Sequence, residues 1–165
     1  MADKITWKLK LKSIMGTSRA TKEKKDMIKE EVGEYIIDKI LEDVSKLKSP
    51  VDMRNKRVNR KFDKLKKKYA RFKKESGLND VPNLEFSGLM LDSIEARPYR
   101  DGVEIGIFEG DAVPRADNHN KFSAKSKKTA VPKRQFIPKA REKFRPSIMK
   151  GIKRIAKEIL REKHG

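Results

Sequence analysis

The stretch IEARPYRDGVEIGIF, residues 94–108, decides the fold. It contains two runs of extended character, 94–99 and 103–108, on either side of a turn that includes Asp101 and Gly102. An Asp-Gly pair between such runs is a strong hairpin signal, because glycine tolerates the positive φ that a tight turn needs. The spacing therefore predicts an antiparallel β-hairpin.

The sequence before the hairpin predicts a strand and a long helix. Residues 1–11 alternate between apolar and mostly Lys side chains, which is the period of a half-buried strand. A helix is predicted from Thr21 to about Ser49, because apolar residues recur there every three or four positions. These residues are Ile28, Val32, Ile36, Ile40, Val44 and Leu47. Residues 89–94 are too few to distinguish a helical turn from a strand.

Residues 53–75 form a second, strongly basic segment. Positions 53–74 hold twelve Lys or Arg residues against one Asp. Apolar residues recur here at spacings of four and three, which predicts a helix with a narrow apolar seam that ends at Ser76 and Gly77. The seam residues are Val58, Phe62, Leu65, Tyr69 and Phe72. Because the aromatic residues all lie on the seam, we expect them to be buried and not to stack on bases.

The sequence after the hairpin begins with a polar segment. Residues 111–130 contain five cations and little apolar material, and they predict a long loop. Long loops in compact domains are often functional, so this one is a candidate contact arm. Prolines favour an extended chain over 131–138. Residues 141–165 predict a basic helix with one apolar face, which starts near Pro146.

Together these elements predict an α+β fold, in which a small antiparallel sheet packs against long amphipathic helices and carries a long polar loop. The length fits a single domain over 1–165. We divide it into an N-terminal strand arm (1–19), an α+β body (20–140) that contains the 111–130 loop, and a C-terminal basic helix (141–165).

The composition narrows the possible functions. There are 43 Lys and Arg against 24 Asp and Glu, a formal charge of +19, and no Cys. The lack of Cys excludes disulfide frameworks, thiolate zinc sites and cysteine nucleophiles. The sequence has no bilayer-length apolar run and no signal-peptide pattern, so we expect a soluble protein that is intracellular when made. Basic flanks surround an acidic middle, and such a charge attracts nucleic acid, an anionic surface or an acidic protein.

The sequence offers no catalytic constellation. The candidate bases are the two histidines, His119 and His164. His164 is the penultimate residue, and Asp117 with His119 gives only two metal ligands. No phosphate-binding glycine loop is present. We therefore predict that the protein is not an enzyme and uses no cofactor, metal or small-molecule substrate.

Several short strings between about residues 45 and 140 occur in a particular order. They are SPV at 49–51, KFDKL at 61–65, KYA at 68–70, PNL at 82–84, SGLMLDSI at 87–94, VEIGI at 103–107, ADNHNKF at 116–122 and VPKRQFIP at 131–138. This series resembles the tail-completion, or head-to-tail joining, proteins of tailed bacteriophages, in the virion morphogenesis family. The family more often has Thr at the position of Ser87, and it usually has Gly where this chain has Ser123.

The resemblance implies an α+β fold, a structural role and no enzymatic activity. Copies of the chain are expected to form a ring of six, or of twelve, in the virion neck, around the DNA passage between head and tail. The other expected partners are the portal or adaptor protein, the tail-tube or tail-terminator protein and, through non-specific contact, packaged double-stranded DNA. The expected location is the virion neck, preceded by the host cytoplasm, with no membrane partner.

Two sets of candidate site residues accompany this interpretation. The subunit or partner interface is expected at His119, Lys121, Phe122, Arg134 and Phe136, because an aromatic side chain beside a cation resembles an interface hot spot. For Phe136, burial in its own subunit's core is an equal alternative. The cations expected to face DNA are Arg57, Arg60, Lys61, Lys64, Lys67, Lys68 and Arg71. The alternative function is a basic nucleic-acid-binding protein of the ribosome-associated or nucleoid type.

Overall fold

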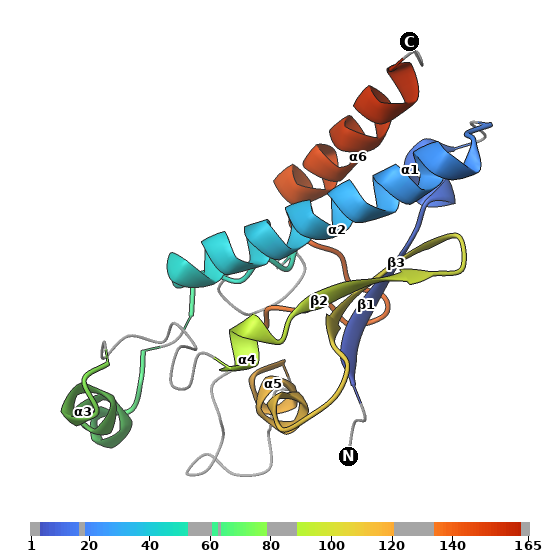
Figure 1. Cartoon of the computed structure of the whole chain (residues 1–165). Helices are drawn as coiled ribbons and strands as arrows, with labels where there is room; N and C mark the ends of the chain where they lie inside the picture. Colours follow the sequence, from blue (N-terminus) through green and yellow to red (C-terminus); the bar gives the residue numbers. More distant parts are fainter. Residues whose placement is uncertain are drawn as a thin grey trace.

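The computed structural model describes residues 4–16, 19–52, 61–62, 64–78, 89–120 and 134–162. In chain order, its elements are β1 (Ile5–Lys10), α1 (Lys12–Met15), α2 (Lys22–Ser45), α3 (Lys67–Glu75), α4 (Leu89–Asp92), β2 (Glu95–Tyr99), β3 (Gly102–Ile107), α5 (Ala112–Asn120) and α6 (Pro146–Arg161). Figure 1 shows α2 lying across a small sheet, α6 packed on α2, and α3 set apart from this body. The predicted α+β fold class is confirmed.

The sheet is built around the predicted hairpin. β2 and β3 pair antiparallel with Arg100 and Asp101 between them, and β1 pairs antiparallel with the other edge of β3. Trp7 on β1 and Ala96 on β2 lie opposite Ile105 on β3 from its two sides. Trp7 and Ile105 are buried. The hairpin and the N-terminal strand are thus confirmed, and the short run before the hairpin contains the helical turn α4.

α2 is the long helix that covers one face of the sheet. The Thr21 hydroxyl caps its start by accepting a hydrogen bond from the Lys24 N–H at 3.2 Å. Five of the six predicted apolar positions form one buried stripe, consisting of Ile28, Val32, Ile36, Ile40 and Val44. The helix ends at Ser45 and not near Ser49, so Leu47, with a φ of +58°, lies in the turn that follows it. Gly33 lets the helix approach the sheet closely, because a Cβ at this position would lie 2.7 Å from the Cβ of Ala96.

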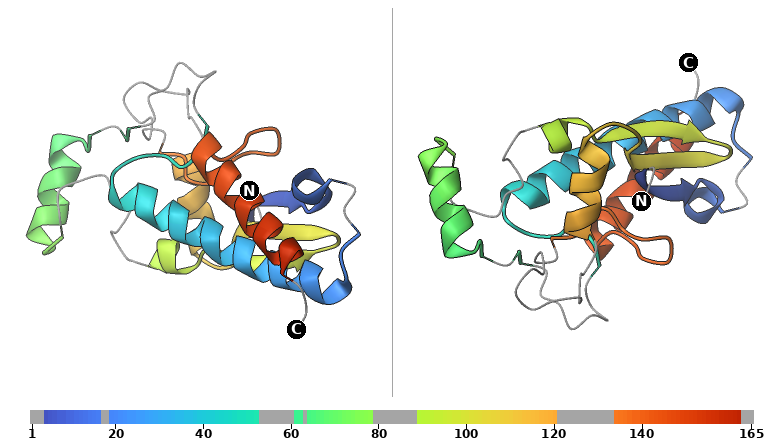
Figure 2. Two further views of the ribbon diagram at one scale, coloured as in Figure 1. Left: turned by 90° about the horizontal axis from the view of Figure 1, so that it is seen from above. Right: turned by 90° about the horizontal axis from the view of Figure 1, so that it is seen from below.

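α6 packs on α2 through the predicted apolar face. Figures 1 and 2 place it on the side of α2 that is turned away from the hairpin. Its buried positions are Ile148, Gly151, Ile152, Ala156 and Ile159. The helix begins at Pro146, as predicted, so the first residues of the predicted C-terminal segment, from 141 to 145, lie outside it. There Phe144 forms an antiparallel bridge with Val51, and the Arg145 N–H donates to the Pro50 carbonyl at 2.8 Å.

An ion pair joins the end of α2 to the start of α6. Nε and Nη2 of Arg145 donate to the two carboxylate oxygens of Asp43 at 2.7 and 3.1 Å. The Asp43 side chain is 3% exposed, whereas that of Arg145 is 22% exposed. A bidentate pair of this kind fixes the relative position of the two helices.

Residues 134–138 form a buried segment of the core. The side-chain amide of Gln135 donates to the Ile137 carbonyl at 3.1 Å and to the Glu142 carboxylate. The Ser49 hydroxyl donates to the Gln135 carbonyl. These bonds supply partners for polar groups that would otherwise be costly to bury.

The prediction of a loop over residues 111–130 is wrong for the first half of that range. Ala112–Asn120 form α5, and residues 121–130 lie outside the described part of the chain. The buried face of α5 is made of the small side chains Ala112, Val113 and Ala116, which give a weak hydrophobic signal in the sequence. Pro114 lies in the first turn, where its missing N–H costs no helical hydrogen bond.

The predicted long basic helix is shorter than expected, and its aromatic residues are placed differently. Within the described residues α3 begins only at Lys67, and Phe62 is buried in a non-helical segment. Tyr69 and Phe72, which were expected in the core, are 42% and 49% exposed. The four-three spacing was misleading, because Phe62 and the two aromatic residues of α3 do not share one helix.

Replacing Gly106 by Ala is expected to disrupt the pairing of β1 with β3. Gly106 has a φ of +151°, and a Cβ there would lie 2.0 Å from the Ile5 carbonyl oxygen. The matched control is Gly110→Ala, since Gly110 also has a positive φ, of +85°, but no atom within 4 Å of the added Cβ. Thermal unfolding followed by circular dichroism should give Gly106→Ala a Tm at least about 4 °C below the control. Equal values would contradict the close approach of the strands.

Candidate functional site

α3 presents a basic, exposed surface. Lys67, Lys68, Arg71 and Lys74 are exposed, and within the described residues no carboxylate is paired with them. Lys67 and Lys68 lie in the first turn, where the helix dipole disfavours positive charge. Like charges within two turns also repel one another. These two unfavourable electrostatic interactions destabilise the isolated helix. An anionic partner that binds the cations would offset them.

Two aromatic rings lie on the same helix. The centroids of Tyr69 and Phe72 are 6.3 Å apart, and both side chains are exposed by more than two fifths of their surface. Adjacent large apolar side chains on a surface mark an interaction site more strongly than scattered ones do. α3 therefore combines exposed apolar area with four exposed cations, Lys67, Lys68, Arg71 and Lys74, that no carboxylate of the described residues pairs with.

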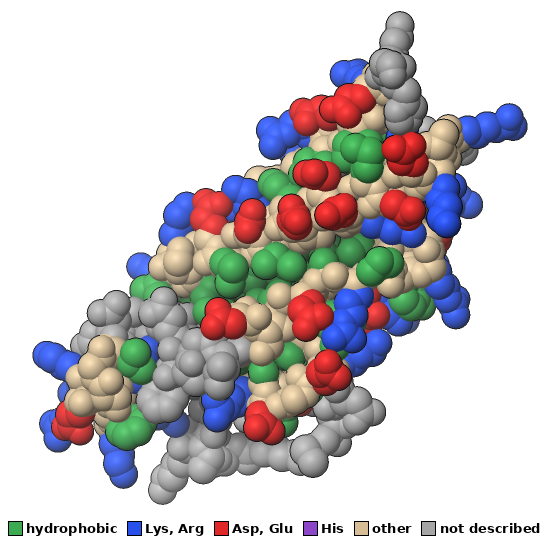
Figure 3. Space-filling model, in the orientation of Figure 1, with side chains coloured by type: hydrophobic (Ala, Val, Ile, Leu, Met, Phe, Trp, Pro, Cys, Tyr) green, Lys and Arg blue, Asp and Glu red, His purple; other side chains and the backbone are tan. Residues whose placement is uncertain are grey.

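A second surface lies along α2. Carboxylates recur every four residues at Asp26, Glu30, Glu34 and Asp38, and therefore follow one side of the helix. Beside them, an open groove of about 420 Å³ runs between α2 and the hairpin. Figure 3 shows the row of acidic side chains along α2 and a band of hydrophobic side chains next to it.

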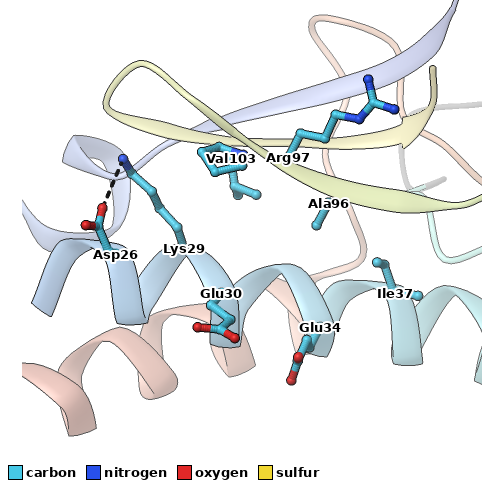
Figure 4. Close-up of a pocket in the computed structure, with 9 residues that line it drawn as sticks. Asp26, Lys29, Glu30, Glu34, Ile37, Ala96, Arg97 and Val103 are labelled. Atoms are coloured by element: carbon cyan, nitrogen blue, oxygen red, sulfur yellow. Dashed lines mark ion pairs between the residues drawn. The ribbon is translucent and has the colours of Figure 1, made fainter. Parts of the chain in front are cut away.

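The groove has an apolar floor and an acidic rim. Ile37 of α2, Ala96 of β2 and Val103 of β3 line the floor. Glu30 and Glu34 form the rim on the α2 side, and their carboxylates point away from the hairpin (Figure 4). Neither rim carboxylate has an ion-pair or hydrogen-bond partner in the part of the chain that the structure describes. The rim therefore retains its negative charge.

The two cations that line the groove are already engaged. Lys29 lies 3.7 Å from the Asp26 carboxylate. Arg97 points away from α2 in Figure 4, pairs with Glu95 at 3.1 Å and lies 4.1 Å from the centre of the Phe108 ring. These contacts leave Glu30 and Glu34 as the groove-lining charges that are not paired within the described part of the chain.

The other face of the sheet is polar and internally paired. Glu104 on β3 accepts hydrogen bonds from the Lys4 ammonium at 2.8 Å and the Thr6 hydroxyl at 2.6 Å. Burial by itself raises the pKa of Glu104, but these two hydrogen bonds and the charges of Lys4 and Lys8 outweigh burial and lower it. The Lys8 ammonium also lies 4.3 Å from the centre of the Tyr99 ring.

Acid is expected to destabilise the fold through Glu104 and Glu42. The pKa of Glu104 is lowered from its ordinary value of 4.5, and hydrogen bonds from Lys39 and Lys46 lower the pKa of Glu42 to about 2. Such carboxyls stabilise the fold above their unfolded-state pKa and lose that contribution as the pH falls. Urea unfolding should therefore show stability declining below about pH 4.5, less steeply in Glu104→Gln. An identical decline in that variant would contradict the role of Glu104.

The structure places the predicted site residues in different environments. The exposed members of the DNA-facing set are Lys61, Lys64, Lys67, Lys68 and Arg71. Helix α3 brings the last three together. Arg57 and Arg60 lie outside the described residues, as do Lys121 and Phe122. The backbone of His119 belongs to α5.

Arg134 and Phe136 lie in the interior. Phe136 is fully buried and Arg134 is 4% exposed, so of the two alternatives for Phe136 the structure gives burial in its own core. The groove was not predicted from the sequence. The four-residue spacing of carboxylates along α2 was the available signal, although it does not reveal the apolar floor beside them.

Two further observations concern the described residues alone. They contain no group of three or more His, Cys, Asp or Glu side chains placed to hold a metal ion. No helix among them is both long enough and apolar enough to cross a membrane.

No family model, curated protein or solved structure matches this chain.

Proposed function

We propose that this chain is a structural protein of the tailed-bacteriophage neck, where its copies form a ring around the DNA passage. The observation that carries the proposal is the ordered series of strings, between about residues 45 and 140, that resembles the tail-completion proteins. The ring docks to the portal or adaptor protein on one side and to the tail-tube or tail-terminator protein on the other. No bond is made or broken in this role.

The positions of these strings in the fold support the proposal. VEIGI, residues 103–107, lies in the central strand β3, and the described part of VPKRQFIP, residues 134–138, is buried. SGLMLDSI contains α4, whose Met90 is also buried. The resemblance therefore includes residues on which the packing of the body depends.

The outer charges support assembly around DNA. Cations are exposed on α6 at Lys150, Lys153, Arg154, Lys157 and Arg161, in addition to those of α3. A ring multiplies this charge around its passage when one of these faces is turned inward. Contacts of this kind are made to phosphates and are independent of the DNA sequence.

A second candidate function is nucleic-acid binding by a ribosome-associated or nucleoid-type protein. The observation that favours it is the exposure of Tyr69 and Phe72 beside the cations of α3, since bases stack on such rings. In that case a single copy binds a polynucleotide directly and has no need of a ring.

Two measurements on the purified full chain distinguish these candidates. Light scattering gives the mass of the particle after nuclease treatment, and ultraviolet absorbance reports retained polynucleotide. A neck protein is expected to form assemblies that survive nuclease and join isolated phage heads or tails. A nuclease-treated monomer that rebinds polynucleotide and releases it steeply with salt would overturn the neck proposal.

A further inference from the structure

We propose that α3 of one copy docks into the groove between α2 and β2 of the next copy. This inference rests on the ring proposed above and names the contact that joins its subunits. The occupant of the groove is thus a second copy of this chain. Because the two surfaces are different, the contact is head-to-tail, and such contacts generate a ring when the rotation between subunits closes.

The charges of the two surfaces are complementary. The groove offers Glu30 and Glu34, and α3 offers Lys68 and Arg71. In both helices the two charges are one turn apart, so two pairs form at matching spacing. None of the four has an ion pair within the described part of its own chain.

The apolar parts of the two surfaces also correspond. The groove has an apolar floor at Ile37, Ala96 and Val103. α3 exposes Tyr69 and Phe72, which gain burial when they rest on that floor. A pair of aromatic anchors surrounded by charge pairs is the usual composition of an interface hot spot.

The order of residues around α3 allows both contacts at once. At about 100° per residue, Arg71, Lys68, Phe72 and Tyr69 follow one another around one side of the helix. When the rings of Tyr69 and Phe72 rest on the apolar floor of the groove, Lys68 and Arg71 both lie toward the same edge of the contact. The acidic rim also lies on one side of the groove, the α2 side.

The position of α3 in a single copy fits a contact between copies. Figures 1 and 2 show α3 apart from the body, whereas the groove lies along α2 beside the hairpin. A polynucleotide would satisfy the cations of α3 but would leave the acidic rim without a partner. A second copy supplies carboxylates for the cations of α3 and cations for the acidic rim. The charges therefore favour self-association over nucleic-acid binding, and the experiments below distinguish the two.

The absence of Cys from the chain permits site-specific crosslinking. A Ser76→Cys copy, substituted at the end of α3, is mixed with a differently tagged Pro98→Cys copy, substituted in the groove, and treated with a bis-maleimide. We expect a covalent heterodimer. Mixing Ser76→Cys with Lys157→Cys, on the exposed face of α6, is the control and should give little product. Equal yields from the two mixtures would overturn the contact.

Charge reversal provides the second arm of the test. Lys68→Glu with Arg71→Glu, or Glu30→Lys with Glu34→Lys, should raise the dissociation constant for self-association about a hundredfold. Combining all four substitutions should restore assembly. Matched controls reverse charges outside the contact, namely Lys67→Glu with Lys74→Glu on α3, and Glu31→Lys on α2 with Glu162→Lys at the end of α6. If the control variants weakened self-association as much as the contact variants do, the inference would also be overturned.

The outcomes separate this contact from the proposed function. If assemblies persist in every variant and no specific crosslink forms, the contact is wrong and the ring proposal stands. If the unmodified chain is monomeric and gives no crosslink, both fail. If α3 reversal abolishes retention of polynucleotide while groove reversal changes nothing, nucleic acid is the partner of α3 and the contact is overturned.

Discussion

Replacing Arg145 by Ala is expected to lower the free energy of unfolding by about 3–5 kcal/mol, because it removes an ion pair and two hydrogen bonds from a buried carboxylate. The Asp43 side chain is only 3% exposed and receives two hydrogen bonds from the guanidinium, at 2.7 and 3.1 Å. Urea unfolding at neutral pH, followed by circular dichroism, measures the loss.

Removing the other member of the ion pair is the control for this prediction. Asp43→Ala should cost less than Arg145→Ala, because the Arg145 side chain is 22% exposed and can be solvated. The double variant Asp43→Leu with Arg145→Met should also cost less than Arg145→Ala, since no buried charge remains. If Asp43→Ala were the more damaging of the two single substitutions, the difference in burial would not be the cause.

Replacing Phe136 by Ala is expected to destabilise the monomer by about 3–5 kcal/mol, the cost of emptying a fully buried aromatic site. Phe136 has no exposed surface, and the adjacent Gln135 is held by a hydrogen bond to the Ile137 carbonyl at 3.1 Å. The segment therefore has little freedom to close the cavity. Urea unfolding of a dilute, nuclease-treated sample measures the effect.

A conservative substitution separates a core role from an interface role. Phe136→Leu should retain most of the stability, because it keeps much of the apolar volume. If Phe136 instead served as an anchor on a partner, Phe136→Ala would leave monomer stability unchanged and reduce assembly. That result would contradict the burial described here.

Long periodic patterns in the sequence predicted the main elements. The alternation around Trp7, the three-four spacing along α2 and the hairpin predicted around Asp101 each correspond to an element of the structure. The turn itself is Arg100–Asp101, and the positive φ expected at Gly102 is found at Arg100 instead. α5 was missed, because its buried face is made of alanines and one valine. The α3 aromatic residues were assigned to the core because spacing alone cannot tell whether a seam has a neighbour to pack against.

Of the two surfaces of the candidate site, only the basic surface of α3 could be predicted from the sequence. Lys67, Lys68 and Arg71 stand out as part of a basic run, and the structure places them together on an exposed helix. The groove depends on tertiary structure, since its floor joins side chains from α2, β2 and β3. Gly33 allows that close approach, and no local pattern in the sequence indicates which strand it will meet.

The central claim is that this chain is a basic building block that docks to its own copies through α3 and the α2 groove. Negative-stain electron microscopy of the nuclease-treated full chain, compared with the Lys68→Glu, Arg71→Glu variant, tests it most directly. We expect closed rings of uniform size from the unmodified chain and dispersed monomers from the variant. Monomers from the unmodified chain, or identical rings from both proteins, would contradict the claim.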